Sequence, residues 1–186
     1  MPHGRGTQRY AGGDARDARN STALFRDETL PRIYPHITRR WHALDVGCGN
    51  GRITHCLVPY FNYVTGLDPF EKPHPSFCVP TALYTSSTFD HHFTNRLRND
   101  VYDMILFWGS FYLFAHRASE VLGKSRTMLS DQGVVVIGDD FRRNTDRDIE
   151  PLHDGLVYSL AEARGDFREV DEFIQADYMR VTVLKL

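Results

Sequence analysis

A loop of alternating glycines is the most distinctive short motif in the sequence. It follows an apolar run and reads Asp45-Val46-Gly47-Cys48-Gly49-Asn50-Gly51. Because glycine has no Cβ, such a loop can turn sharply and let a ligand approach its backbone closely. The motif therefore predicts a ligand-binding loop, and the charges around it indicate the class of ligand.

Two side chains beside this loop separate the classes of nucleotide ligand. A dinucleotide-binding loop has the spacing G-x-G-x-x-G, but Arg52 stands where the third glycine would fall. The loop also lacks the Gly-Lys-Ser/Thr of a phosphate-binding P-loop. Asp45 would repel a phosphate and attract a cation. The spacing and charge favour a ligand such as S-adenosylmethionine, which carries a sulfonium and an ammonium group.

A second acid follows one strand later along the chain. Asp68 ends the apolar segment 63–68, and a carboxylate at that place can accept hydrogen bonds from both hydroxyls of a ribose. An aspartate before Pro69 is also a common way to begin a turn. Because dinucleotide folds use the same acid, Asp68 does not separate the classes by itself. Together with the glycine loop, it favours a ribose contact.

The elements that must position these residues alternate between strands and helices. We predict strands over residues 41–46, 63–68, 82–86, 102–108 and 134–138, and helices over 52–61, 118–129 and 149–164. This alternation is typical of βαβ units and a mostly parallel sheet. In such sheets ligands bind beyond the carboxyl ends of the strands, where the glycine loop and Asp68 both fall.

Three segments depart from the simple alternation. Residues 24–40 have helical spacing, but Pro31 and Pro35 limit them to one or two short helices. Residues 69–80 contain four prolines and are predicted to lack a long helix. Residues 130–133 are predicted to form a turn.

Two final strands are predicted over residues 167–174 and 178–186. Only Gln175-Ala176-Asp177 joins them. A parallel pair needs a crossover of about a dozen residues or more, so this pair must be an antiparallel hairpin.

The composition is that of one soluble globular domain. The 186 residues are 41% hydrophobic and 25% charged, with a net charge of −2, so no basic excess favours nucleic acid or an anionic membrane. No apolar run approaches the ~18–20 residues of a membrane helix, and the amino terminus lacks a secretory signal. Three cysteines without a CxxC pair suggest reduced thiols, and we expect a cytoplasmic protein.

The amino-terminal segment differs in composition from the rest. Residues 1–22 are rich in Gly, Arg, Asp and Asn, and we predict a flexible tail followed by one domain over residues 23–186. An arm that closes over a substrate is the alternative for this tail.

Taken in order, the motifs resemble those of the class I S-adenosylmethionine-dependent methyltransferases. Residues 43–52 resemble the first motif of that family, and residues 64–69 resemble the second, whose acid holds the ribose. Residues 102–106 resemble the fourth-strand motif, and residues 128–137 resemble the turn into the fifth strand. The resemblance implies a Rossmann-like α/β fold with a mostly parallel seven-stranded sheet, helices on both faces and a C-terminal antiparallel hairpin.

The resemblance covers residues 24–186 and implies a set of cofactor contacts. The implied cofactor-binding residues are Asp45, Gly47, Cys48, Gly49, Asn50, Gly51, Asp68, Pro69, Ser87, Thr88, Phe89, Phe107 and Trp108. The glycine-loop backbone would line the methionine part, and Asp45 would orient the loop and its ammonium contacts. Asp68 would hold the ribose, and Pro69 or Phe70 would flank the adenine.

Two of these contacts depart from the family pattern or have a structural alternative. The family usually offers an acid to the adenine after the third strand, but this chain has Ser86-Ser87-Thr88-Phe89 there. Phe107 and Trp108 end the fourth strand and would border the methionine part. Core packing at the strand end is the alternative for Trp108 and the aromatic residues that follow it.

Methyl transfer requires the protein mainly to align the acceptor with the methyl donor. The sulfonium donor is already activated, so the enzyme aligns the acceptor, excludes water and sometimes removes a proton. Asp140, after the fifth strand, and Tyr112 are the candidate catalytic residues, and capping is the alternative role for the acid. His91 and His92 follow Asp90 but lack a clear third metal ligand, so we expect a loop with solvated histidines there and no metal.

The expected function is S-adenosylmethionine-dependent methyl transfer to a small molecule, with S-adenosylhomocysteine as the product. One alternative is an RNA or protein methyltransferase that uses Arg32, Arg39 and Arg40 as a local basic patch. Another is a non-catalytic, S-adenosylmethionine-binding subunit that serves a partner. A nucleotide-dependent oxidoreductase is disfavoured by Arg52. The sequence predicts no particular oligomeric state.

Overall fold

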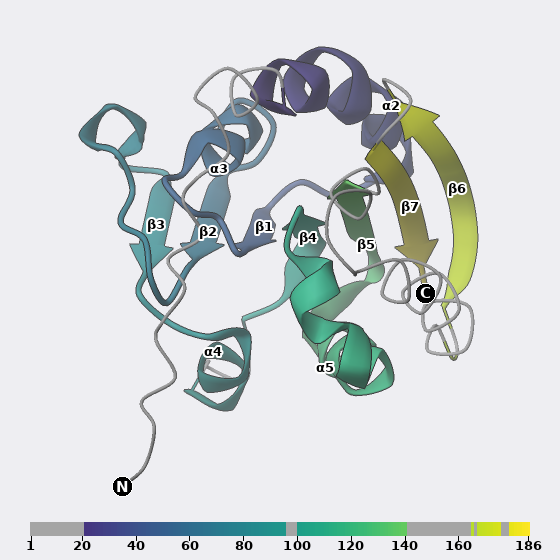
Figure 1. Cartoon of the computed structure of the whole chain (residues 1–186). Coiled ribbons are helices and arrows are strands. Elements are labelled where there is room, and N and C mark those ends of the chain that lie inside the picture. Colours follow the sequence, from purple (N-terminus) through teal and green to yellow (C-terminus); the bar gives the residue numbers. More distant parts are fainter. Residues whose placement is uncertain (1–20, 96–99, 141–164, 166, 176–178) are drawn as a thin grey trace, which may run out of the picture.

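A seven-stranded sheet in the order β3-β2-β1-β4-β5-β7-β6 forms the centre of the molecule (Figure 1). We describe the computed structural model over residues 21–95, 100–140, 165, 167–175 and 179–186. The strands are β1 (His42–Val46), β2 (Tyr63–Leu67), β3 (Ala82–Thr85), β4 (Tyr102–Trp108), β5 (Leu129–Asp140), β6 (Arg168–Gln175) and β7 (Met179–Lys185). This arrangement confirms the predicted Rossmann-like sheet.

The strand directions create one edge of the sheet where ligands can bind. Strands β1 to β5 pair in parallel, so their carboxyl ends meet at the same edge. β1 lies between β2 and β4, and the chain direction across the sheet reverses there, which is where open α/β sheets bind ligands. β7 pairs antiparallel with both β5 and β6, which confirms the predicted hairpin.

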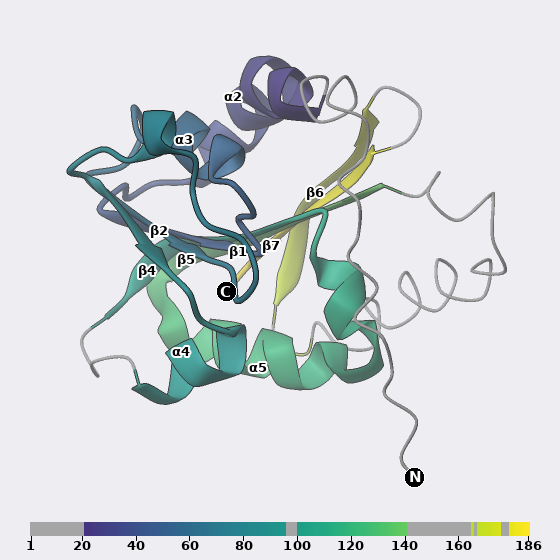
Figure 2. The ribbon, with the colours of Figure 1, turned by 60° about the vertical axis from the view of Figure 1, so that its left-hand side comes forward.

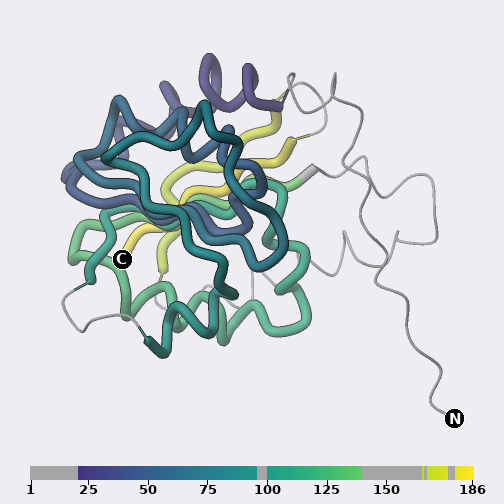
Figure 3. Tube along the Cα trace, turned by 90° about the vertical axis from the view of Figure 1, so that its left-hand side faces the viewer, coloured from purple at the N-terminus to yellow at the C-terminus, as the bar shows by residue number. Residues whose placement is uncertain are grey.

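Helices cover both faces of this sheet, as predicted. The α-helices are α2 (Leu30–Ile33), α3 (Arg52–Leu57), α4 (Phe89–Asn95) and α5 (Ala118–Met128). A π-helical segment, η1 (Phe25–Thr29), and three 3-10 helices, η2 (Tyr34–His36), η3 (Pro75–Phe77) and η4 (Phe111–Arg117), are also among the described residues. Figure 2 shows α2 and α3 on one side of the sheet and α4 and α5 on the other, and the trace in Figure 3 shows the same layers. The helix predicted over residues 149–164 lies outside the described residues.

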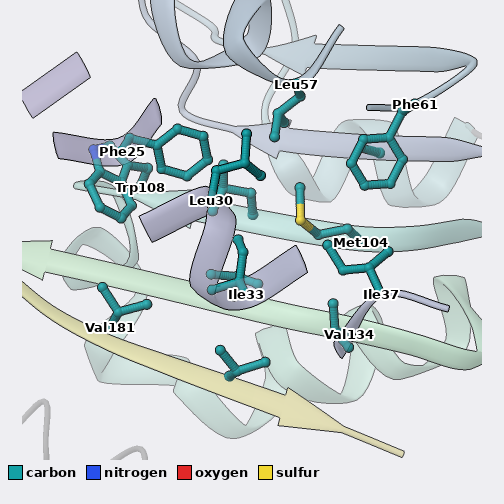
Figure 4. Close-up of a cluster of buried hydrophobic side chains, with 14 of the residues drawn as sticks. Phe25, Leu30, Ile33, Ile37, Leu57, Phe61, Met104, Trp108, Val134 and Val181 are labelled. Carbon is teal, nitrogen blue, oxygen red and sulfur yellow. The ribbon is translucent and has the colours of Figure 1, made fainter. Parts of the chain in front are cut away.

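The amino-terminal helical segment packs across the face that α3 also covers. Pro31 and Pro35 begin α2 and η2, and the segment changes from one helical form to the next at these points, as the prolines predict. Its apolar side chains join those of the sheet in one buried cluster (Figure 4). Phe25 packs edge-on against Trp108, with ring centroids 4.8 Å apart.

The predicted flexible tail lies almost wholly outside the described residues. The description begins at Ser21, which is already helical, and Ser21 Oγ accepts a 3.0 Å hydrogen bond from Trp108 Nε1. Ser21 is therefore tied to the carboxyl end of β4, and the boundary at residue 22 stays a prediction.

Two expectations from the sequence are wrong. Residues 130–133 do not form a separate turn, because β5 starts at Leu129 directly after α5. Leu129 pairs with Tyr102, and Ser130 Oγ donates a hydrogen bond to Asp103, which hold this stretch against β4. Residues 89–95, expected to be a loop, form α4, whose Asp90 pairs with Lys124 of α5.

The opposite edge of the sheet, at the amino ends of the strands, carries exposed aromatic residues. Trp41 precedes β1 and is 51% exposed, and Tyr63 begins β2 and is 49% exposed. Their ring centroids lie 5.5 Å apart. This edge therefore differs from the carboxyl edge, where Trp108 is buried.

Candidate cofactor-binding site

The glycine loop folds tightly over the carboxyl end of β1. Gly47, Gly49 and Gly51 all have positive φ angles, of 77°, 52° and 89°, which residues with a side chain rarely adopt. The amides of Gly47 and Cys48 both donate to the Leu67 carbonyl, at 2.8 and 3.0 Å. These bonds attach the loop to the end of β2, so the two predicted binding segments form one continuous surface.

Asp45 lies beneath the loop. Its side chain is buried, and Oδ2 accepts a 2.6 Å hydrogen bond from Thr54 Oγ1 of α3. Burial, the largest influence, raises the pKa of Asp45 to about 7, and the nearby negative charge of Asp68 adds to this while the Thr54 bond opposes it. Asp45 thus links the loop to α3, and its pKa lies near neutral pH.

Asp68 holds the loop from the side of β2. Its Oδ2 accepts the Gly49 amide at 3.0 Å, and its Oδ1 accepts the amides of Phe70 and Glu71, both at 2.8 Å. A carboxylate has about four lone-pair sites, so three backbone bonds leave one site for a ligand. Asp68 therefore acts both as a turn-forming residue and as an acceptor beside the glycine loop.

Ser110, in the segment after β4, packs directly against the glycine loop. Its hydroxyl donates a 2.6 Å hydrogen bond to the Val46 carbonyl. A Cβ added to Gly47 would lie 2.6 Å from the Cβ of Ser110, so only glycine fits at position 47. The sequence analysis missed Ser110, although it is the one serine within a run of aromatic residues.

Tyr84 of β3 covers the far end of the same loop. A Cβ on Gly51 would meet the Tyr84 ring at 2.8 Å, and a Cβ on Gly66 would meet it at 2.9 Å. Burial raises the pKa of the Tyr84 hydroxyl to about 12, so it stays protonated and donates to the Phe77 carbonyl at 3.2 Å. Thr54 and Tyr84, which the sequence analysis did not identify, thus hold the loop through their contacts with Asp45 and Gly51.

Cys48 lies within the loop and packs as a small, partly buried group. Its Sγ would lie 2.9 Å from a Cβ on Gly66, so the thiol points toward β2. Burial raises the pKa of this thiol well above its usual value, and Asp45 and Asp68 add to the effect. The thiol is therefore uncharged, which suits packing and makes it a poor nucleophile.

The segments predicted to contact adenine lie beside Asp68. The Asp68 amide donates to the Thr85 carbonyl at 3.2 Å, which places residues 86–88 next to it. Ser87 is buried and hydrogen-bonds His91, and Thr88 Oγ1 accepts the His91 amide at 3.2 Å, so these two residues begin α4. Phe70 is 92% exposed and free to cover a flat ring.

Three predicted aromatic contacts are packed into the protein interior. Phe89 and Phe107 are buried on the α4 and α5 side, with ring centroids 5.7 Å apart. Trp108 points to the other face, where a Cβ on Gly138 would lie 2.4 Å from its ring. We therefore assign these side chains to packing beneath the site, which for Trp108 matches the alternative given from the sequence.

The candidate catalytic residues lie at the same edge of the sheet. Asp140 is the last residue of β5 and pairs with Met179, and its side chain lies outside the described part of the structure. Tyr112 of η4 is partly buried against the core beside α5. Their catalytic roles stay predictions.

The other charged residues singled out in the sequence have partners in the structure. His91 and His92 hydrogen-bond Ser87 and Tyr102, and within the described residues no group of three or more His, Cys, Asp or Glu is arranged to hold a metal. Arg32 binds both carboxylate oxygens of Asp171 at 2.9 Å, which removes it from the proposed basic patch.

Searches with protein-family models and among curated proteins found no match to this chain. Solved structures do match. The N-methyltransferase NodS from Bradyrhizobium japonicum WM9 has a TM-score of 0.61 at 16% identity, over 92% of this chain and 97% of that one. The 1,6-didemethyltoxoflavin-N1-methyltransferase of Burkholderia thailandensis has a TM-score of 0.65 at 18% identity, over 92% and 82% of the two chains.

A third structure agrees with these two. The plantazolicin methyltransferase BpumL has a TM-score of 0.65 at 15% identity, over 91% of this chain and 86% of that one. The chain has the class I S-adenosylmethionine-dependent methyltransferase fold. Within this methyltransferase fold, the glycine loop, Asp45 and Asp68 lie at the switch point of the sheet. No helix among the described residues is long and apolar enough to span a membrane.

Proposed function

We propose that this chain binds S-adenosylmethionine on the loop of residues 47–51 and transfers its methyl group to a small molecule. The observation that carries the proposal is the attachment of this loop to two acids at the switch point. Asp45 lies beneath the loop and Asp68 binds the Gly49 amide. Asp45 beneath the loop would repel a phosphate group, and Arg52 stands in place of the third glycine of a dinucleotide loop.

The residues present fit this cofactor. Gly49 leaves the middle of the loop without a side chain, and the nearest group to a Cβ there is Glu71 Oε2 at 3.5 Å. Asp68 and Glu71 make this surface negative, which suits the sulfonium and ammonium groups. Asp68 would accept one ribose hydroxyl, and Phe70 would lie against the adenine.

When bound, S-adenosylmethionine supplies an activated methyl group. The protein then needs to hold the acceptor in line with that methyl and to exclude water. Trp108, buried beneath the amino-terminal helical segment, and Ser110 give the carboxyl ends of β4 and β1 a fixed geometry. Asp140 is our candidate for removing a proton from the acceptor, where the acceptor needs it.

A small-molecule acceptor is favoured over a nucleic acid. Arg32 is neutralised by Asp171, and the Arg40 guanidinium stacks on Tyr34 at 3.7 Å from the ring centroid, so the basic patch is partly used within the chain. Two similar structures are described as acting on 1,6-didemethyltoxoflavin and magnesium protoporphyrin IX.

Calorimetry tests the cofactor directly. We expect S-adenosylmethionine and S-adenosylhomocysteine to bind and NAD to give no heat, and the reverse result would overturn the proposal. Turnover of radiolabelled S-adenosylmethionine with a panel of small acceptors and RNA then tests the activity. Cofactor binding without transfer to any acceptor would favour a non-catalytic, S-adenosylmethionine-binding subunit. Transfer to RNA alone would favour an RNA methyltransferase.

A further inference from the structure

An ion pair joins helix α4 to the segment that follows β4, on the face of the sheet where α4 and α5 lie (Figure 2). Asp90 lies in the first turn of α4, and its Oδ2 is 2.6 Å from Nη2 of Arg117, the last residue of η4. Its Oδ1 accepts a 2.7 Å hydrogen bond from Nζ of Lys124 in α5. Both oxygens of one carboxylate are therefore held by cations from two elements that follow β4.

Aromatic packing supports this ion pair. Phe89, next to Asp90, packs edge-on against Phe114 of η4, with ring centroids 6.1 Å apart, and the Arg117 guanidinium lies 5.5 Å from the centroid of the same Phe114 ring. The hydrogen bond from Arg117 is the largest influence on the Asp90 carboxyl and lowers its pKa, while partial burial opposes this and Lys124 adds to it. A single exposed ion pair adds little stability, but this one has two cations and a packed pair of rings behind it.

The chain before α4 leads from Asp90 to one side of the candidate site. Thr88, two residues before Asp90, accepts the amide of His91 with its Oγ1 and so satisfies a donor in the first turn of the helix. Three residues before Thr88, the Thr85 carbonyl accepts the Asp68 amide at 3.2 Å. The position of Asp90 is thus linked in two short steps to the acid beside the glycine loop.

The other partner of the ion pair leads to the opposite side of the loop. Ser110 directly precedes η4, and its hydroxyl donates a 2.6 Å hydrogen bond to the Val46 carbonyl. The Cβ of Ser110 also lies against Gly47. Helix η4 therefore runs from the glycine loop at its start to Asp90 at its end, where Arg117 lies.

These contacts form a closed ring around the carboxyl edge of the sheet. From the glycine loop the ring passes through Asp68 to α4 and through Ser110 to η4, and the pair of Asp90 with Arg117 closes it. The other hydrogen bonds of the ring each use a backbone group, whereas this link joins two side chains. It is therefore the link that a substitution can remove without touching the loop.

We propose that Asp90 and Arg117 are positioning residues that hold the two sides of the cofactor site at a fixed spacing. This inference rests on the proposed function, in which the chain before α4 flanks the adenosine part and Ser110 lies against the loop that holds the methionine part. Each residue acts through the segment that it holds. Without the pair, the two segments must be ordered when the cofactor binds, and this ordering lowers the affinity.

The test is a double-mutant cycle, measured by calorimetry with S-adenosylhomocysteine at a temperature where circular dichroism shows every variant to be folded. We expect Asp90→Asn and Arg117→Gln each to weaken binding at least fivefold. The double variant should bind no more weakly than the weaker single variant, because both changes remove one link. Arg117→Lys keeps the cation and should stay within threefold of the wild type. Arg26→Gln is the matched control, because Arg26 and Asp27 form an ion pair of the same 2.6 Å length on η1, and it should change the affinity less than twofold.

The outcomes separate this inference from the proposed function. If the wild-type chain does not bind S-adenosylhomocysteine, the proposed cofactor is wrong and the inference falls with it. If the wild type binds and the folded variants bind equally well, the pair stabilises the fold without positioning the site. Additive losses in the double variant would also overturn the inference, because the two residues would then act separately. Should Asp90→Asn not fold, the comparison of Arg117→Gln with Arg117→Lys decides, and equal losses in these two variants would contradict the proposed link.

Discussion

Ser110 and Gly47 are in direct contact, and this contact leaves no room for a side chain at position 47. The Cβ of Ser110 would lie 2.6 Å from a Cβ on Gly47, whose φ of 77° is itself strained for any other residue. Two independent constraints therefore meet at one glycine of the proposed cofactor loop. The contact also joins the end of β1 to the segment that follows β4.

Gly47→Ala is expected to lower the free energy of unfolding by about 2–6 kcal/mol, because strain and overpacking each cost about 1–3 kcal/mol. Cofactor affinity should fall at least tenfold with it. Urea unfolding and calorimetry measure the two effects.

Two other glycines separate the causes in this experiment. Gly109 has a φ of 66° and open space around it, so Gly109→Ala has strain without a clash and should cost about 1–3 kcal/mol. Gly123, inside α5, has open space and ordinary backbone, so Gly123→Ala should stabilise by about 0.5–1 kcal/mol. Equal stability of the Gly47 and Gly109 variants would show that the contact with Ser110 is unimportant.

Asp45 should make stability fall as pH rises. Burial raises the pKa of Asp45 from 3.8 to about 7, so between these values the folded state holds a proton that the unfolded state has lost. The stabilisation from this proton is complete below about pH 4 and is lost as the pH rises through 7, a change on the order of 4 kcal/mol.

Asp45→Asn removes this titration and keeps an oxygen that can accept from Thr54. We expect the free energy of unfolding of the variant to increase relative to that of the wild type as the pH rises from 4 to 8. Urea unfolding at each pH measures this difference. Parallel pH profiles for the two proteins would mean that Asp45 titrates normally.

The hydroxyl of Thr54 should stabilise the folded protein through its hydrogen bond to Asp45. Thr54→Val keeps the shape of the side chain but leaves buried Asp45 without its 2.6 Å donor, so the expected loss of stability is about 1–3 kcal/mol at pH 8. Thr54→Ser keeps the donor and is the matched control. If the serine variant loses as much as the valine variant, packing of the methyl group explains the effect instead of the hydrogen bond.

Asp68 should discriminate ribose from deoxyribose. Asp68→Ala is expected to weaken S-adenosylhomocysteine at least tenfold, which corresponds to about 1.4 kcal/mol. It should also remove the preference of the wild type for this ligand over its 2′-deoxy analogue. If calorimetry shows that the variant still prefers S-adenosylhomocysteine over its 2′-deoxy analogue, Asp68 does not bind the ribose. Its role is then to accept hydrogen bonds from the amides of Gly49, Phe70 and Glu71.

Much of the fold was predictable because local patterns agree with the tertiary structure. The apolar run of β4 is buried along its whole length, and the short link between β6 and β7 leaves only an antiparallel pairing. Helix α4 was missed because its stability comes from distant partners. Asp90 pairs with Arg117 and Lys124, and these contacts have no signature within the segment itself.

The site shows the same division between local and distant information. The glycine loop and Asp68 belong to local motifs, so the sequence identifies them. Ser110 lies 64 residues from Val46, which it contacts, so its role appears only when β1 and β4 are neighbours. Phe107 and Trp108 are adjacent in the sequence but point to opposite faces, because side chains alternate along a strand.

The burial of Trp108 gives the protein an internal fluorescent reporter. The chain has two tryptophans, and Trp41 lies half-exposed at the amino edge of the sheet while Trp108 lies buried at the carboxyl edge, bonded to Ser21. Trp41→Phe leaves one indole, whose emission should be blue-shifted by its apolar surroundings. That single fluorophore lies where the amino-terminal segment meets the proposed site, so its spectrum would follow docking and release of that segment without any added label.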